Sequence, residues 1–154
     1  MTRALIALKD LVAAKSRLSG VLDPSQRRAL ALAMAEDVLV VLGEHPALEE
    51  VVLVSDDPGA HLLAANYGAR LVVESSLGCR GLNPVLQACV TRLDPPPDAQ
   101  LLLLHCDLPL LRAADVSAAL QQQRQTGGLL IGSDAAGVGT NLLCFDAAQR
   151  PRLQ

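Results

Sequence analysis

The feature that most constrains the fold is a run of four leucines, Leu101–Leu104, which continues into His105-Cys106-Asp107-Leu108-Pro109. A continuous apolar run of this length is typical of a strand buried on both faces, in the middle of a parallel sheet. Open α/β sheets bind ligands at the carboxyl ends of such strands. The run therefore predicts a central strand that places Asp107 at a ligand site. The alternative is that Asp107 only shapes the turn before the next helix.

The rest of the chain alternates between strand-like and helix-like segments. Apolar runs of strand length occupy residues 4–8, 51–55, 70–73, 101–104, 128–132 and 141–145. Alternation of this kind predicts an α/β fold, a three-layer, doubly wound and mostly parallel sheet with helices on both faces.

Capping signals place the helices between these runs. Asp23 as N-cap and Pro24 as first residue open a helix that should stop near Gly43. Its apolar stripe is expected to consist of Leu30, Met34, Val38 and Val41. A second helix should end before Gly68, which suits a C′ position. Asn83 and Pro84 are expected to be the N-cap and first residue of a third helix, and a fourth should run through Val116 and Leu120.

Composition narrows the class of protein. A chain of 154 residues favours one domain. With a net charge of −3, and Tyr67 and Phe145 as its whole aromatic set, the chain lacks the charge and the stacking platforms of nucleic-acid-binding proteins. It has neither an apolar run of about 20 residues nor an export signal, so no membrane partner is expected. Its four cysteines form no CxxC pair, and free thiols suit the reducing cytoplasm, which is the expected location.

A cationic loop follows the first strand. Lys9, Lys15 and Arg17 fall within nine residues, but the loop has neither the G-x-x-x-x-G-K-[ST] nor the G-x-G-x-x-G pattern. If the first, second and fourth strands are parallel neighbours, this loop meets the residues after the other strands at one sheet edge. Cations, backbone N–H groups and an acid suit a phosphate-rich ligand with Mg²⁺. The alternative is a solvated basic loop.

No set of Ser, His and Asp, or of Cys and His, indicates a covalent nucleophile. His105 stands beside Asp107 in the sequence, but strand alternation is expected to point it to the opposite face. His105 is therefore expected to be structural.

Four segments resemble, in the same order, the sequence blocks of the guanylyltransferases of coenzyme F420 biosynthesis. They are residues 8–18, Gly81-Leu82-Asn83, residues 106–111 and Gly139-Thr140-Asn141. The resemblance implies a GT-A-like nucleotidyltransferase fold. It also implies transfer of GMP from GTP to the phosphate of a small phosphorylated carboxylic acid, namely 2-phospho-L-lactate, phosphoenolpyruvate or 3-phospho-D-glycerate, with release of diphosphate.

The site residues follow from the same resemblance, together with the expected sheet edge. The nucleotide-binding residues would be Lys9, Lys15, Ser16, Arg17, Ser55, Gly81 and Asn83. Of these, Lys15 and Arg17 would act in catalysis together with Asp107, which would also bind Mg²⁺. Thr140 and Asn141 would contact the acceptor acid.

The chain departs from this family at its end. Family members continue into a Phe-Gly…Ser-Phe segment that contacts the acceptor and a pair of aspartates that completes the metal site, and neither has a counterpart here. Residues 1–154 are thus expected to form a single nucleotidyltransferase domain without its C-terminal part. Its exposed sheet edge would be available for a homodimer. Two alternatives stay open. One is another GT-A nucleotidyltransferase, such as a molybdenum-cofactor guanylyltransferase-like or sugar-nucleotide enzyme, whose first loop is usually glycine-rich. The other is a non-catalytic GTP-binding module.

Overall fold

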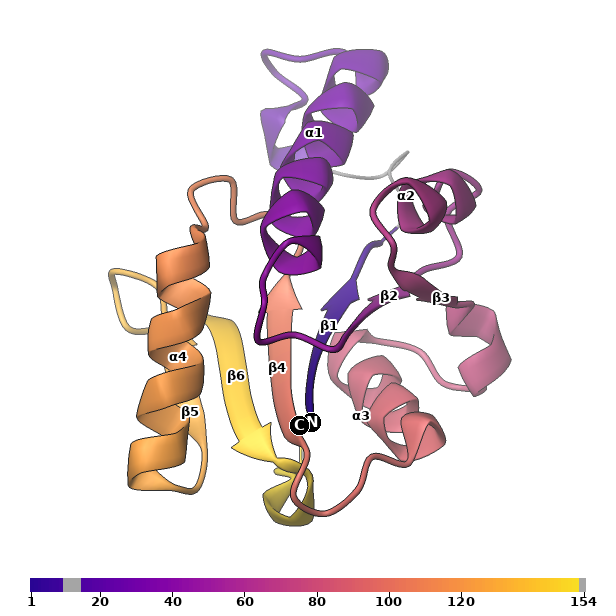
Figure 1. Cartoon of the computed structure of the whole chain (residues 1–154). Helices are drawn as coiled ribbons and strands as arrows, with labels where there is room; N and C mark the ends of the chain where they lie inside the picture. The colour runs from indigo at the N-terminus through magenta and orange to yellow at the C-terminus, as the bar shows by residue number, and fades with distance from the viewer. Residues whose placement is uncertain (10–14, 153–154) are drawn as a thin grey trace.

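A computed structural model describes residues 1–9 and 15–152. It shows one six-stranded sheet between two layers of helices, with strand order β3-β2-β1-β4-β6-β5 (Figure 1). The strands are β1 (Thr2–Ala7), β2 (Glu50–Val54), β3 (Arg70–Val72), β4 (Gln100–His105), β5 (Leu130–Ser133) and β6 (Thr140–Asp146). The first four are parallel, and β6 is antiparallel to both β4 and β5. The predicted mostly parallel sheet, with the first, second and fourth strands as neighbours, is confirmed.

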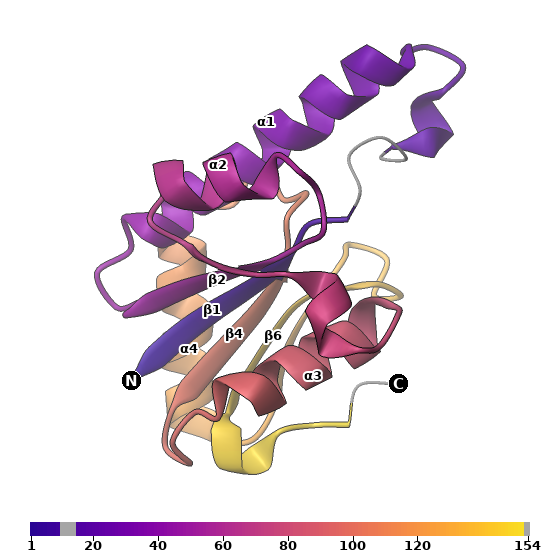
Figure 2. The same ribbon diagram turned by 90° about the vertical axis from the view of Figure 1, so that its right-hand side faces the viewer.

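The helices cover both faces of the sheet. They are α1 (Pro24–Gly43), α2 (Ala60–Asn66), α3 (Leu82–Leu93) and α4 (Ala113–Thr126), with short 3-10 helices η1 (Ser16–Leu18), η2 (Glu74–Leu77) and η3 (Ala147–Gln149). Helices α1, α2 and α4 pack on one face and α3 on the other (Figure 2). In the described part of the chain, no helix is long and apolar enough to cross a membrane.

Strand β4 contributes to both hydrophobic cores. Leu102 and Leu104 pack beneath α1 and α4, whereas Leu101 and Leu103 pack against α3. All four side chains are buried, as the uninterrupted apolar run predicts. Successive residues of a strand face opposite sides of the sheet, so this one segment joins the two cores.

Helix α1 begins where the sequence predicts. The Gln26 N–H donates to Asp23 Oδ1 at 2.8 Å, and the Asp23 N–H donates to Gln26 Oε1 at 3.0 Å, which completes a capping box. The predicted apolar stripe is right at Val38, which is buried, and wrong at Leu30, which is 36% exposed. The buried positions are Ala31, Ala35, Val38, Leu39 and Leu42. Apart from Val38, the buried positions lie one residue C-terminal to the predicted ones.

The predicted start of α3 is also wrong. Leu82 is its first residue and Gly81 is its N-cap, so Asn83 lies inside the first turn. Gly81 has φ +93°, a conformation that residues with a side chain rarely adopt. The glycine therefore sets the point at which the chain turns into α3. After α2, Gly68 has φ +65°, as expected of a C′ residue.

Candidate functional site

A cavity of about 1000 Å³ lies at the carboxyl edge of the four parallel strands. Each strand contributes the residues that follow it: Leu8, Lys9 and Lys15 after β1; Asp56 after β2; Glu74, Ser75, Gly78, Cys79, Arg80, Gly81 and Leu82 after β3; and His105, Cys106 and Asp107 at the end of β4. This is the position at which open parallel sheets bind ligands. The size is at the upper end of the range for small-molecule sites.

An ion pair joins the cationic loop to the end of β4. Lys15 Nζ lies 2.7 Å from Asp107 Oδ2, across 92 residues of sequence. Lys15 adopts the left-handed conformation, with φ 55° and ψ 36°, directly before η1. The predicted convergence of Lys15 and Asp107 on one edge is thus seen in the structure. Residues 10–14 of the same predicted loop lie outside the described residues.

The pKa of Asp107 lies below its usual value. Partial burial by itself would raise it, but the hydrogen bond and charge of Lys15 outweigh that effect, with a further contribution from His105. Asp107 is therefore a carboxylate at neutral pH. A half-exposed anion beside a lysine can accept a metal ion or hold the lysine for a phosphate.

The seven predicted nucleotide-binding residues divide into those that line the large cavity and those that do not, and the second group includes Asn83, which lines a smaller cavity. Lys9, Lys15 and Gly81 line the large cavity. Ser16 and Arg17 are exposed on η1 and do not line it.

Ser55 is in the second group and is buried. Its hydroxyl donates to the Leu8 carbonyl at 2.7 Å and accepts from the Asp57 N–H at 3.0 Å. Ser55 therefore ties the ends of β1 and β2 together, and its neighbour Asp56 is the residue that faces the cavity.

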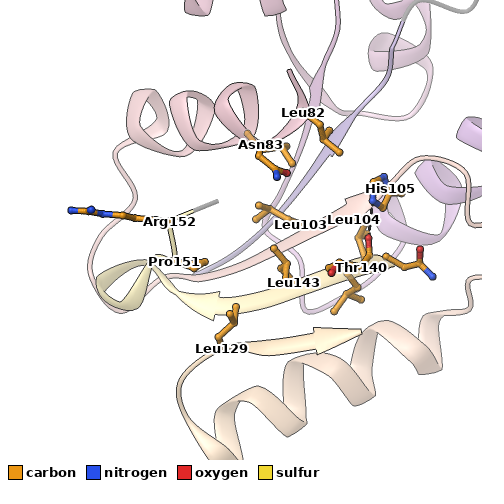
Figure 3. Close-up of a pocket in the computed structure, with 13 residues that line it drawn as sticks. Leu82, Asn83, Leu103, Leu104, His105, Leu129, Thr140, Leu143, Pro151 and Arg152 are labelled. Atoms are coloured by element: carbon orange, nitrogen blue, oxygen red, sulfur yellow. Dashed lines mark hydrogen bonds between the residues drawn. The ribbon is translucent and has the colours of Figure 1, made fainter. Parts of the chain in front are cut away.

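Figure 3 shows the lining of a second, smaller cavity of about 260 Å³, which shares Leu82 and His105 with the first. Its apolar surface comes from leucines of α3, β4, β6 and the segment before β5: Leu82, Leu86, Leu103, Leu104, Leu129, Leu142 and Leu143. Its polar side chains include Asn83 and the predicted acceptor residues Thr140 and Asn141. Arg152 also lines it, but its guanidinium points away from these side chains in Figure 3.

His105 corrects an expectation. It lines both cavities, shares the larger one with Asp107, and its charge contributes to lowering the pKa of that carboxyl. The expected opposite orientation was wrong, because residues two positions apart on a strand point to the same side. The His105 Nε2–H donates to the Thr140 carbonyl at 2.8 Å, since a carbonyl can only accept. Like His105, Leu82 lines both cavities, so these two residues are where the cavities adjoin.

Sequence reasoning expected the segment after β2, which includes Asp56, at this sheet edge, but it missed Glu74, Cys79 and Arg80 as cavity residues. Asp56 Oδ1 accepts the Ser75 N–H at 2.9 Å, which links the end of β2 to η2. The available signal was their position, since each lies in the segment that follows a parallel strand.

The thiol beside Asp107 is not a nucleophile at neutral pH. Burial, and then the charge of Asp107, raise the pKa of Cys106 to about 11. The reactive form of cysteine is the thiolate, so Cys106 stays protonated and acts as a small packing residue.

The residues at the carboxyl edge of the sheet could hold Mg²⁺ only together with ligands from a bound substrate. Within residues 1–9 and 15–152, no group of three or more His, Cys, Asp and Glu side chains could hold a metal ion. Asp107 offers one carboxylate. Mg²⁺ is commonly bound through one or two carboxylates plus substrate phosphates and water, so Asp107 fits a metal that arrives with a nucleotide.

The chain is similar in sequence to known guanylyltransferases. The chain is 39% identical over 145 residues to a phosphoenolpyruvate guanylyltransferase of Roseiflexus castenholzii, a match that covers 94% of the chain and 63% of that protein. It is 38% identical over 147 residues to a protein of the same name in Streptomyces coelicolor, covering 94% and 68%. The chain thus spans about two thirds of the length of these relatives.

A solved structure shows the same fold. A protein from Desulfovibrio desulfuricans G20, described as a nucleotide-diphospho-sugar transferase, superposes with a TM-score of 0.78 at 18% identity, over 98% of this chain and 65% of that one. The expected nucleotidyltransferase fold is confirmed. The family described as guanylyl transferase CofC like matches residues 2–150. The chain belongs to this guanylyltransferase family.

Proposed function

We propose that this chain binds GTP and a small phosphorylated carboxylic acid and transfers GMP from the first to the second, in the biosynthesis of coenzyme F420 in the cytoplasm. Phosphoenolpyruvate is the first candidate acceptor because the relatives carry its name, followed by 2-phospho-L-lactate and 3-phospho-D-glycerate. The observation that carries the proposal is the 2.7 Å contact between Lys15 and Asp107 at the rim of a nucleotide-sized cavity.

The two cavities suit two substrates. GTP would lie in the larger one, with its phosphates toward Lys9 and Lys15. The acceptor would lie in the smaller one, beside Asn83, Thr140 and Asn141. Because His105 and Leu82 line both cavities, the reacting groups would meet beside these two residues. Holding two reactants in contact and in line provides a large part of the rate enhancement in such reactions.

The reaction needs no protein nucleophile. An oxygen of the acceptor phosphate forms a bond to the α-phosphorus of GTP, the bond from that phosphorus to the α–β bridging oxygen breaks, and diphosphate leaves with the electron pair. Both substrates are anions, so their repulsion must be neutralised. Lys9 and Lys15 supply positive charge, and Lys15 can contact Asp107 and a phosphate together because its ammonium has three donors. Asp107 would hold Mg²⁺, which would supply further charge stabilisation.

The test is incubation with GTP labelled at the α-phosphate, Mg²⁺ and each of the three acids in turn. The expected result is a labelled guanosine diphosphate-linked product together with unlabelled diphosphate from one acid, and little product from a Lys15→Ala variant. Absence of product with every acid would overturn the transferase proposal.

A second candidate is a non-catalytic GTP-binding module. It is favoured by the single carboxylate at the metal position among the described residues. Calorimetry with GTP and Mg²⁺ separates the candidates. Binding without turnover supports the module, whereas absence of binding excludes both.

A further inference from the structure

We propose that Glu74 is the residue that selects guanine, an assignment that rests on the proposed function. Glu74 directly follows β3, is half-buried and lines the large cavity. Its carboxylate makes no hydrogen bond or ion pair with the residues that the structure describes. A carboxylate that faces a cavity without a partner requires a donor from a ligand or from water.

The cavity has a phosphate end and a base end. Lys15 reaches from the β1 loop to Asp107 at the end of β4. In the sheet order β3-β2-β1-β4, the ends of β3 and β4 are three strand spacings apart, roughly 14 Å at about 4.8 Å per spacing. An extended nucleoside triphosphate can bridge such a separation. Its phosphates belong at the lysine end, which leaves the uncharged base beside β3.

The charges around the cavity support this direction. Asp56 and Glu74 lie on the β2 and β3 side of the cavity and would repel a triphosphate placed there. Arg80 also lines the cavity, but it stands beside Gly81 at the start of α3. There its charge adds to the backbone N–H groups of a helix N-terminus, which favour phosphate. The aliphatic side chains of Leu82 and Val85 line the same cavity and offer apolar surface to a base.

Glu74 is a better candidate than Asp56 for contact with the base. Asp56 Oδ1 already accepts the Ser75 N–H at 2.9 Å, so this carboxylate holds the backbone of η2 in place. Both oxygens of Glu74 are available. Asp56 is therefore a positioning residue for the turn that carries Glu74.

The chemistry of the bases explains the selection. Guanine has two adjacent donors on its pairing edge, N1–H and the 2-amino group, and a carboxylate can accept both in a bidentate contact. Adenine and cytosine each place a ring-nitrogen acceptor at that position, which a carboxylate repels, and uracil offers one donor only. A site built around such a contact rejects analogues because its buried polar group is left unpaired.

Calorimetry on the whole chain, with Mg²⁺ and GTP, inosine triphosphate or ATP, tests the assignment. Inosine triphosphate keeps N1–H but lacks the 2-amino group. The wild-type chain should bind GTP most tightly, inosine triphosphate less tightly and ATP least. Glu74→Gln should weaken GTP binding by about tenfold or more, weaken inosine triphosphate binding less, and leave ATP binding no weaker. The matched control Glu44→Gln changes an exposed glutamate that does not line the cavity and should leave all three affinities unchanged.

The outcomes separate the two proposals. If the wild-type chain binds no GTP, the proposed function fails. If it prefers GTP and Glu74→Gln keeps that preference, only the Glu74 assignment fails. Asp56→Asn should weaken all three nucleotides alike, and loss of discrimination in this variant with none in Glu74→Gln would also overturn the assignment. Thermal unfolding of each variant shows that it is folded, and Glu74→Asp, with a shorter reach, should recover part of the GTP preference.

Discussion

The polar residues at the two ends of the central strands β1 and β4 differ in their surroundings: those at one end are buried within the fold, and those at the other line a cavity. At the amino ends, Thr2 and Gln100 are buried and form hydrogen bonds with residues of α4. Gln100 Nε2 donates to the Leu120 carbonyl at 2.9 Å, while Arg124 Nε donates to Gln100 Oε1 at 3.1 Å and Arg124 Nη2 donates to Thr2 Oγ1 at 3.3 Å. At the carboxyl ends, Lys9, Lys15 and Asp107 line the large cavity.

The difference shows how one sheet separates stability from ligand binding. Polar groups at the amino ends satisfy one another within the protein, so their removal leaves buried partners unpaired. Charged groups at the carboxyl ends are partly exposed, and their contacts with each other contribute little to stability. Substitutions at one end should therefore change the free energy of unfolding, and substitutions at the other should change affinity for a ligand.

The largest expected effect is at the amino ends. Gln123 is fully buried, and its side chain contacts Gln100 and the Gly128 carbonyl. Gln123→Ala should lower the free energy of unfolding by about 2 kcal/mol, because it leaves buried polar groups without partners, and GTP affinity should stay unchanged. Urea denaturation measures the first and calorimetry the second. The control Gln121→Ala removes an exposed glutamine of the same helix. Equal stability of the two variants would contradict the contrast.

The second largest expected effect is on GTP affinity, from a substitution at the carboxyl ends of the strands. Lys15→Ala should weaken GTP binding by about tenfold, or roughly 1.4 kcal/mol, because it removes positive charge from the phosphate end of the cavity. The free energy of unfolding should change by less than about 1 kcal/mol, as for exposed ion pairs. Arg70→Ala, which removes a cation paired with Glu50 outside both cavities, should leave GTP affinity unaltered. A Lys15→Ala chain that binds GTP as the wild type does would exclude Lys15 from phosphate binding.

The smallest effect is the pH dependence of the Lys15–Asp107 pair. The pKa of Asp107 is lower in the folded chain than its usual value, which is near 3.9 in unfolded chains. The pair therefore contributes stability above about pH 4, and that contribution is lost as the pH falls through the lower folded pKa. Urea denaturation of the wild type and Asp107→Asn should show a small advantage of the wild type at pH 6 that shrinks toward pH 3. A constant difference would mean that the pair does not stabilise the fold.

The sequence predicted what depends on neighbours along the chain. Leu101–Leu104 specified a doubly buried strand because burial on both faces needs an uninterrupted apolar run. Asp23 and Pro24 fixed the start of α1 because capping involves residues a few positions apart. Apart from Val38, the buried stripe of α1 was predicted one residue away from the observed one. Adjacent positions of that helix carry apolar residues at similar spacing, and only packing selects between them.

Some features of the site could be predicted from the sequence, and others were decided only by the tertiary structure. Residue types and the order of the blocks indicated Lys15 and Asp107, and the family confirms the class of protein. Only the tertiary structure decided that these two meet at 2.7 Å, that Ser55 is used inside the fold, and that His105 stands between two cavities. The physical reason is the separation along the chain of the residues that interact. Hydrophobic period and capping act within a few residues, whereas these contacts depend on the strand order β3-β2-β1-β4-β6-β5, which brings together segments far apart in the chain.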